Sequence, residues 1–122
     1  MKTVFLALGG LMGAAGVTLA AAGAHVASGV GLESASQMLL FHACATIGAV
    51  LAVQAGLLSP RTGLLAAAGF VLGTALFSGD LSLRAFAGTP LFRMAAPSGG
   101  VIMIASWLVL ALAALVARLR RP

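Results

Sequence analysis

Two side chains that could do chemistry lie one helical turn apart in this sequence. Asp80 and Arg84 have the i, i+4 spacing of an ion pair on one face of a helix, within a largely apolar segment. A carboxylate inside a membrane span is costly and usually faces the protein interior or a wet cavity. The spacing favours a pair that ties its helix to neighbouring helices. The alternative is a protonatable carboxylate on a proton or solute path.

The two histidines are the other candidate ligands. His42 stands within an apolar run, where a lone histidine is more often a hydrogen-bonded packing residue than a ligand, and His25 ends the preceding run. Two imidazoles near one membrane surface could ligate haem or a metal ion. Neither histidine belongs to an HxxxH, Glu-x-x-His or CxxCH motif, and Cys44 is the only cysteine. We therefore predict no metal site and no cofactor.

Three further polar side chains complete the candidate set. Ser78 and Ser98 adjoin glycines at the outer ends of the third and fourth runs, and such a site can bind an anion where it meets a helix N-terminus. Trp107 falls mid-run, so its indole N–H is expected to find a partner on another helix. The hypothetical ligand-binding residues are His25, His42, Ser78, Asp80, Arg84, Ser98 and Trp107. No Ser-His-Asp arrangement, phosphate loop or paired carboxylate set accompanies them, so we predict that the protein is not an enzyme.

The composition requires a lipid environment. Of the 122 residues, 61% are hydrophobic and only 7% are charged, whereas soluble domains carry about a quarter charged residues. A chain this short cannot hide so many apolar side chains in its own core. This excludes a soluble enzyme and a nucleic-acid-binding domain, despite the net charge of +5.

Four apolar runs are long enough to span a bilayer, which takes roughly 20 residues each. They cover residues 3–23, 34–58, 62–86 and 97–118, and none alternates as a membrane β-barrel strand does. We predict one all-α domain over residues 1–122, a four-helix transmembrane bundle. The first run resembles a secretory signal peptide, but it is longer than a signal core and three more spans follow, so we expect it to be retained.

The basic residues predict the orientation of these spans. With the N-terminus inside, one side of the membrane holds five basic residues and the other only Arg84 and Arg93, together with both acids, Glu33 and Asp80. The positive-inside rule then places both termini in the cytoplasm. The expected location is a bacterial inner membrane. The five basic residues of the inner side are Lys2, Arg61, Arg118, Arg120 and Arg121.

Small residues recur along one face of several runs. Membrane helices associate by close packing at such residues, because lipid tails are as apolar as leucine. We predict that the aligned small faces turn toward one another in the bundle. The glycines predicted to pack are Gly9, Gly13, Gly16, Gly56, Gly69, Gly73, Gly99 and Gly100.

Four blocks of the sequence resemble a known family, the YgdD-type membrane proteins. The blocks are AAAGAH (20–25), FHACA (41–45), LGTALFSGDL (72–81) and APSGGVIMIASW (96–107). This bacterial family has no established function and has small mitochondrial transmembrane relatives. The resemblance implies four spans and supplies no activity. It implies that His25, His42, Ser78, Gly79, Pro97, Gly99, Gly100 and Trp107 stand at family positions.

The sequence departs from the family pattern at three places. Met38-Leu39 stands where the family has Tyr-Gln, which removes two polar candidates to partner His42. Asp80 replaces a serine, and Ala96 replaces a threonine that would cap the fourth helix. A family function that relied on the Tyr-Gln pair would be altered here.

Three functions fit these observations. The first, which we favour, is a non-enzymatic structural or assembly protein that self-associates or joins a larger membrane complex, with membrane lipid as its surroundings. The second is a bundle that binds haem, a metal, a quinone or a lipid around His42, His25 and the Asp80–Arg84 pair. The third is a small dimeric transporter, which is less favoured because transport sites generally lie near the midplane of the membrane.

Overall fold

The computed structural model describes residues 1–25 and 31–122. They form four helices: α1 (Lys2–His25), α2 (Leu32–Gln54), α3 (Pro60–Ala87) and α4 (Ala95–Arg120), and no strand occurs within these ranges. All four are long and apolar enough to cross a membrane. In lipid such segments become helices because a helix satisfies its own backbone hydrogen bonds. The predicted all-α, four-helix transmembrane architecture is confirmed.

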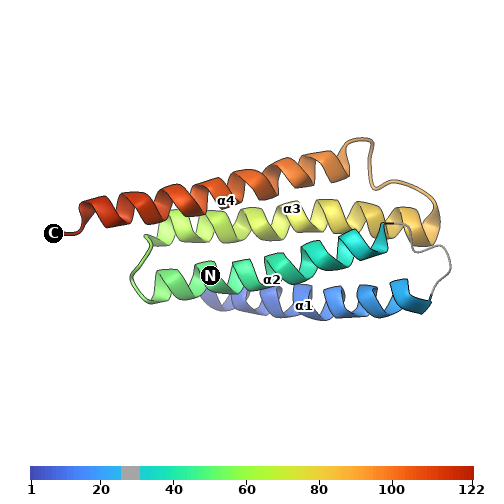
Figure 1. Cartoon of the computed structure of the whole chain (residues 1–122), viewed down its shortest axis with the longest axis horizontal. Coiled ribbons are helices and arrows are strands. Elements are labelled where there is room, and N and C mark those ends of the chain that lie inside the picture. The colour runs from blue at the N-terminus through green and yellow to red at the C-terminus, as the bar shows by residue number, and fades with distance from the viewer. Residues whose placement is uncertain (26–30) are drawn as a thin grey trace.

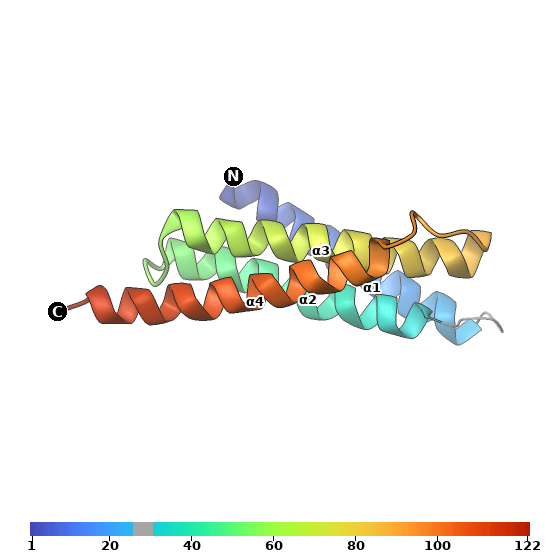
Figure 2. The ribbon, with the colours of Figure 1, turned by 90° about the horizontal axis from the view of Figure 1, so that it is seen from above.

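The helices follow one another across the molecule in chain order (Figure 1). Among the described residues, the extensive contacts join α1 to α2, α2 to α3 and α3 to α4, while α1 touches α3 only lightly. Two helices therefore lie at the edges of the bundle, α1 on one side and α4 on the other (Figures 1 and 2). In the most apolar stretch of each helix, 44% of the residues of α2 are buried, against 22% for α1 and 11% for α4.

Both termini lie at the end of the bundle where α2 turns into α3. Lys2 Nζ donates to Gln54 Oε1 at 2.8 Å, which joins the start of α1 to the end of α2. Arg121 donates from its guanidinium to the carbonyl oxygen of Gly56 in the α2–α3 turn. The end of α1, the start of α2 and the α3–α4 connection lie at the opposite end, as antiparallel neighbours require. The cytoplasmic placement of the termini stays a prediction.

The second helix ends at Gln54, four residues before the end predicted from the apolar run. Gly56 adopts φ +71°, the left-handed conformation that commonly ends a helix and that glycine adopts without strain. A Cβ placed on Gly56 would meet nothing within 4 Å. The prediction that Gly56 packs against another helix is therefore wrong, and this glycine belongs to the turn.

The third and fourth helices begin two residues before their predicted starts. Ser59 caps α3 by accepting a hydrogen bond from the Thr62 N–H at 3.3 Å, which leaves Pro60 at the first helical position, where its missing N–H costs nothing. Helix α4 begins at Ala95 rather than Pro97. A proline fits within a first turn because the N–H groups there have no intrahelical acceptor.

Two glycines bring the backbones of α3 and α4 close together. A Cβ on Gly99 would stand 2.5 Å from the Gly73 carbonyl oxygen, and one on Gly73 would stand 2.8 Å from the Gly99 oxygen. Nearby, a Cβ on Gly69 would overlap the side chain of Ser106. Gly100 differs from its prediction, because a Cβ there would meet nothing within 4 Å. It points away from α3, one residue round the helix from Gly99.

Candidate functional site

The buried imidazole of His42 is held by partners at both of its ring nitrogens. Nδ1 lies 2.8 Å from the carbonyl oxygen of Met38, and Nε2 lies 3.1 Å from the indole nitrogen of Trp107 on α4. A carbonyl can only accept and an indole N–H can only donate. These partners assign the proton to Nδ1, so the ring is the neutral tautomer that accepts from Trp107.

The two rings that share this hydrogen bond pack with a third ring, that of Phe70, and the cluster joins three helices. The ring centroids of Phe70 and Trp107 lie 4.8 Å apart, and His42 lies 5.5 Å from Phe70 and 5.9 Å from Trp107. Phe70 is fully buried. Tilted rings at these distances attract one another beyond their shared burial. The cluster links α2 and α3 to α4 near the middle of the bundle.

His42 is therefore placed as a packing residue whose polar atoms are satisfied. Both nitrogens are occupied, so binding a metal or haem iron would first require breaking the contact to Trp107 or to Met38. The carbonyl of Met38 supplies one partner although its side chain is apolar, so the departure from the family's Tyr-Gln does not orphan the imidazole. The partner that Trp107 was expected to have on another helix is His42.

Asp80 lies near the end of the bundle that is farther from the two termini, and it is completely buried. Arg84 Nε donates to Oδ2 at 2.8 Å, as the spacing predicted, and the backbone N–H of Leu91 donates to Oδ1 at 2.8 Å. Leu91 belongs to the connection between α3 and α4. The carboxylate thus fastens this loop over the end of α3, which favours a structural use over a proton or solute path.

The predicted polar site separates into parts along the bundle. Ser78 Oγ donates to the carbonyl of Ala35 at 2.8 Å, which aligns α3 with α2 at this level. At about 1.5 Å per residue, His42 lies about 10 Å to one side of that level and Asp80 about 3 Å to the other. The two residues are therefore roughly 13 Å apart along the axis. They do not form one site.

The two histidines are farther apart still. Ser36 Oγ donates to the Gly16 carbonyl at 2.8 Å, which aligns α1 with α2. From that level His25 lies nine residues toward the α1–α2 end and His42 six residues the other way, a separation of about 22 Å along the axis. His25 is exposed at the end of α1. One haem or metal ion cannot bridge them in this arrangement.

The remaining predicted site residue, Ser98, lies in the first turn of α4, where its backbone N–H donates to the Met94 carbonyl at 3.0 Å. Within residues 1–25 and 31–122, no group of three or more His, Cys, Asp or Glu side chains could hold a metal ion. Every buried side-chain nitrogen or oxygen in these ranges also has a hydrogen-bond partner.

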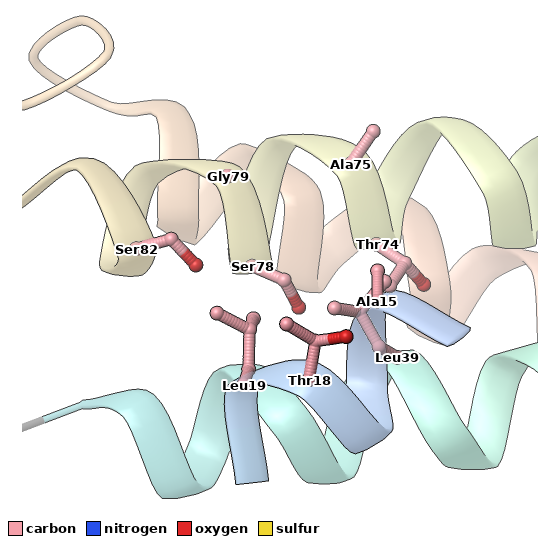
Figure 3. A pocket seen from close by; sticks show the side chains of 9 residues that line it. All are labelled: Ala15, Thr18, Leu19, Leu39, Thr74, Ala75, Ser78, Gly79 and Ser82. Atoms are coloured by element: carbon pink, nitrogen blue, oxygen red, sulfur yellow. The ribbon is translucent and has the colours of Figure 1, made fainter. Parts of the chain in front are cut away.

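A groove lined by two leucines and otherwise by small and hydroxyl-bearing residues runs between α1 and α3 over α2 (Figure 3). Its volume is about 380 Å³. Three of its four hydroxyls bind within the protein: Thr18 donates to the Ala14 carbonyl, Ser78 to Ala35 and Thr74 to the sulfur of Met103. We call this the α1–α3 groove. Its lining residues are Ala15, Thr18, Leu19, Leu39, Thr74, Ala75, Ser78, Gly79 and Ser82.

Sequence reasoning missed the groups that partner the polar side chains. The acceptors for His42 Nδ1 and Ser78 and the second donor to Asp80 are backbone groups, which leave no trace in residue types. Phe70 was also missed. It lies three residues before Gly73 on the buried side of α3, and that spacing was the available indication.

Four apolar helices of spanning length, whose buried polar side chains all have hydrogen-bond partners within the described residues, define a multi-pass membrane protein. Residues 19–100, two thirds of the chain, match the family DUF423, described as a protein of unknown function, and the chain belongs to this family. The prediction of an uncharacterised family is confirmed, and the YgdD name stays a prediction. No curated protein and no solved structure matches the chain.

Proposed function

We propose that this protein is a non-enzymatic membrane protein that assembles with further helices, from a second copy or a larger membrane complex, at the α1–α3 groove. The observation that carries the proposal is the size of the residues that stand outward there. Ala15 and Thr18 on α1 and Ala75 and Gly79 on α3 are all exposed. Small residues allow helix backbones to approach closely, which is how membrane helices associate.

The outward face of α4 has the opposite character and serves as the comparison. Large, branched side chains stand out from it, with Val101, Ile104 and Leu112 each more than 60% exposed, and alanines such as Ala111 lie among them. Such side chains suit lipid tails and hold a neighbouring backbone away. We therefore expect the outward face of α4 to contact lipid and that of α1 to contact protein.

Association between copies is tested by energy transfer between labelled proteins in vesicles, with Ala15→Leu as the variant and Ala111→Leu, on the exposed face of α4, as its control. We expect Ala15→Leu to reduce association about tenfold, since loss of close packing costs roughly 1 kcal/mol or more. Ala111→Leu should leave association unchanged. Co-purification from native membranes tests a larger complex. A monomer without partners in both experiments would refute the proposal.

We propose further that the protein resides in a bacterial inner membrane with both termini in the cytoplasm. The support is the distribution of charge, because five basic residues lie at the end that carries the termini. Accessibility of single cysteines at Ser59 and Thr89, in a background with Cys44→Ala, measures the orientation in intact cells. Ser59 lies at the end that carries the termini, so labelling of Ser59→Cys by an impermeant reagent would show that the termini lie outside the cytoplasm.

A second candidate function is the binding of an apolar ligand, a quinone or a lipid tail, between α2 and α4. A groove of about 600 Å³ lies there, with Met38, Phe41, Phe77 and Ile104 among its apolar residues and His42 and Trp107 in its wall. Mass spectrometry of an organic extract of the purified protein would identify such a ligand. An absorption spectrum would show haem. An empty extract and a colourless protein would remove this candidate.

A further inference from the structure

The whole net charge of the chain lies at one end of the bundle. At the end formed by the α2–α3 turn and the two termini, five basic residues stand without any acid: Lys2, Arg61, Arg118, Arg120 and Arg121. At the other end Arg84 and Arg93 balance Glu33 and Asp80. The first end therefore carries +5 and the second carries zero, with histidine neutral. We call the first the basic end.

An apolar pocket opens beside this charge. It lies between the first turns of α3 and the last turns of α4 and has a volume of about 660 Å³. Leu65 and Leu112 line it and are each 61% exposed, so it is a surface groove. From Arg120 to Val109, its innermost α4 residue, the groove extends about 16 Å along the helix axis at 1.5 Å per residue.

Polar side chains line the part of this pocket that lies at the basic end. Arg120 and Arg121 come from the end of α4, and the hydroxyls of Ser59 and Thr62 at the start of α3 lie 2.8 Å apart and bond each other. Arg121 gives one N–H to the Gly56 carbonyl, and a guanidinium has four more. The N-terminus of α3 adds a partial positive charge at the same place. The last turns of α4 extend past the α2–α3 turn (Figure 1), which leaves the arginines accessible.

We propose that this pocket binds an anionic phospholipid, with the phosphate on Arg120 and Arg121 and an acyl chain along Leu65, Val109 and Leu112. A basic pocket between transmembrane helices at one membrane surface is suited to an anionic lipid headgroup. A second copy of the chain is a poor occupant, because it would bring another five positive charges to this end. A zwitterionic lipid fills the groove but gains little from the arginines.

Native mass spectrometry of the purified full chain tests the site with phosphatidylglycerol and phosphatidylcholine of identical acyl chains. We expect phosphatidylglycerol to bind more tightly than phosphatidylcholine. In Arg120→Gln/Arg121→Gln its affinity should fall about thirtyfold, since an arginine near the membrane surface contributes about 1 kcal/mol. Equal binding of the two lipids by the unaltered protein would overturn the proposal.

The matched control is Lys2→Gln/Arg61→Gln, which removes the same charge from the same end but leaves the lining of the pocket intact. This variant should still bind phosphatidylglycerol more tightly than phosphatidylcholine, with most of the difference retained. If it loses as much as the pocket variant, the attraction belongs to the surface charge as a whole and the site is refuted. Excess inorganic phosphate separates the two sources of the anion. Displacement of the lipid by phosphate alone would show that the acyl groove contributes nothing.

Discussion

The α1–α2 and α3–α4 pairs are both antiparallel helices packed through glycine, but different atoms lie opposite the glycines. Across α1–α2, a Cβ on Gly9 would stand 2.7 Å from Ile47 Cγ1, and one on Gly16 would stand 2.8 Å from Leu40 Cγ. Across α3–α4, a Cβ on Gly99 would meet the Gly73 oxygen at 2.5 Å and the Phe77 nitrogen at 2.7 Å. The atoms nearest the glycines are thus side-chain atoms in the first pair and, at Gly99, backbone atoms in the second.

This difference separates a rigid half of the molecule from an adaptable half. A side chain can rotate away from a new methyl group, but a helix backbone can move only if the whole helix moves. The α3–α4 contact therefore fixes the register that brings Trp107 to His42 and the loop at Leu91 to Asp80. The α1–α2 pair is aligned by the Ser36 hydrogen bond to the Gly16 carbonyl, but the atoms nearest its glycines belong to side chains that can rotate. This suits an edge helix whose outer face is proposed to bind a partner.

The largest expected effect is that of Gly99→Ala. A methyl group at this position must separate α3 from α4, so we expect a loss of about 3 kcal/mol in the free energy of unfolding, at the upper end for overpacking. Reversible unfolding in mixed detergent micelles measures it. Gly100→Ala is the control, because its methyl group meets open space and alanine favours the helix by up to about 1 kcal/mol. Equal loss in both variants would contradict the rigid contact.

The sequence was sufficient to predict the number of helices, their approximate limits and the ion pair of Asp80 with Arg84. These depend on hydropathy and on spacing within one helix. The sequence was not sufficient to tell that Gly9 and Gly99 pack against another helix whereas Gly56 and Gly100 do not. That distinction requires the rotation of each helix about its axis and the residue at which it ends. The sequence also could not show that His42, Asp80 and His25 lie far apart along the bundle axis, because these distances depend on how neighbouring helices align.

A smaller effect is expected from Trp107→Phe, which acts on the polar contact that the rigid half positions. The phenyl ring keeps the stacking on Phe70 but has no N–H, so the Nε2 of His42 loses its donor. We expect a loss of about 1 kcal/mol in the free energy of unfolding, as for other hydrogen bonds between membrane helices. A double-mutant cycle with His42→Leu isolates the pair. A coupling energy near zero would show that the hydrogen bond does not contribute to stability.

The matching variant in the adaptable half is Gly16→Ala, for which the smallest effect is expected. Its methyl group would stand 2.8 Å from Leu40 Cγ, and that half-buried side chain can rotate. The cost of this adjustment opposes the gain of up to about 1 kcal/mol from replacing glycine in a helix, so unfolding should change by less than about 0.5 kcal/mol. The hydrogen bond from Ser36 to the Gly16 carbonyl does not depend on the side chain and should persist. If Gly16→Ala destabilises the protein as much as Gly99→Ala, the two pairs are equally rigid. An adaptable α1 would then no longer support assembly at the α1–α3 groove.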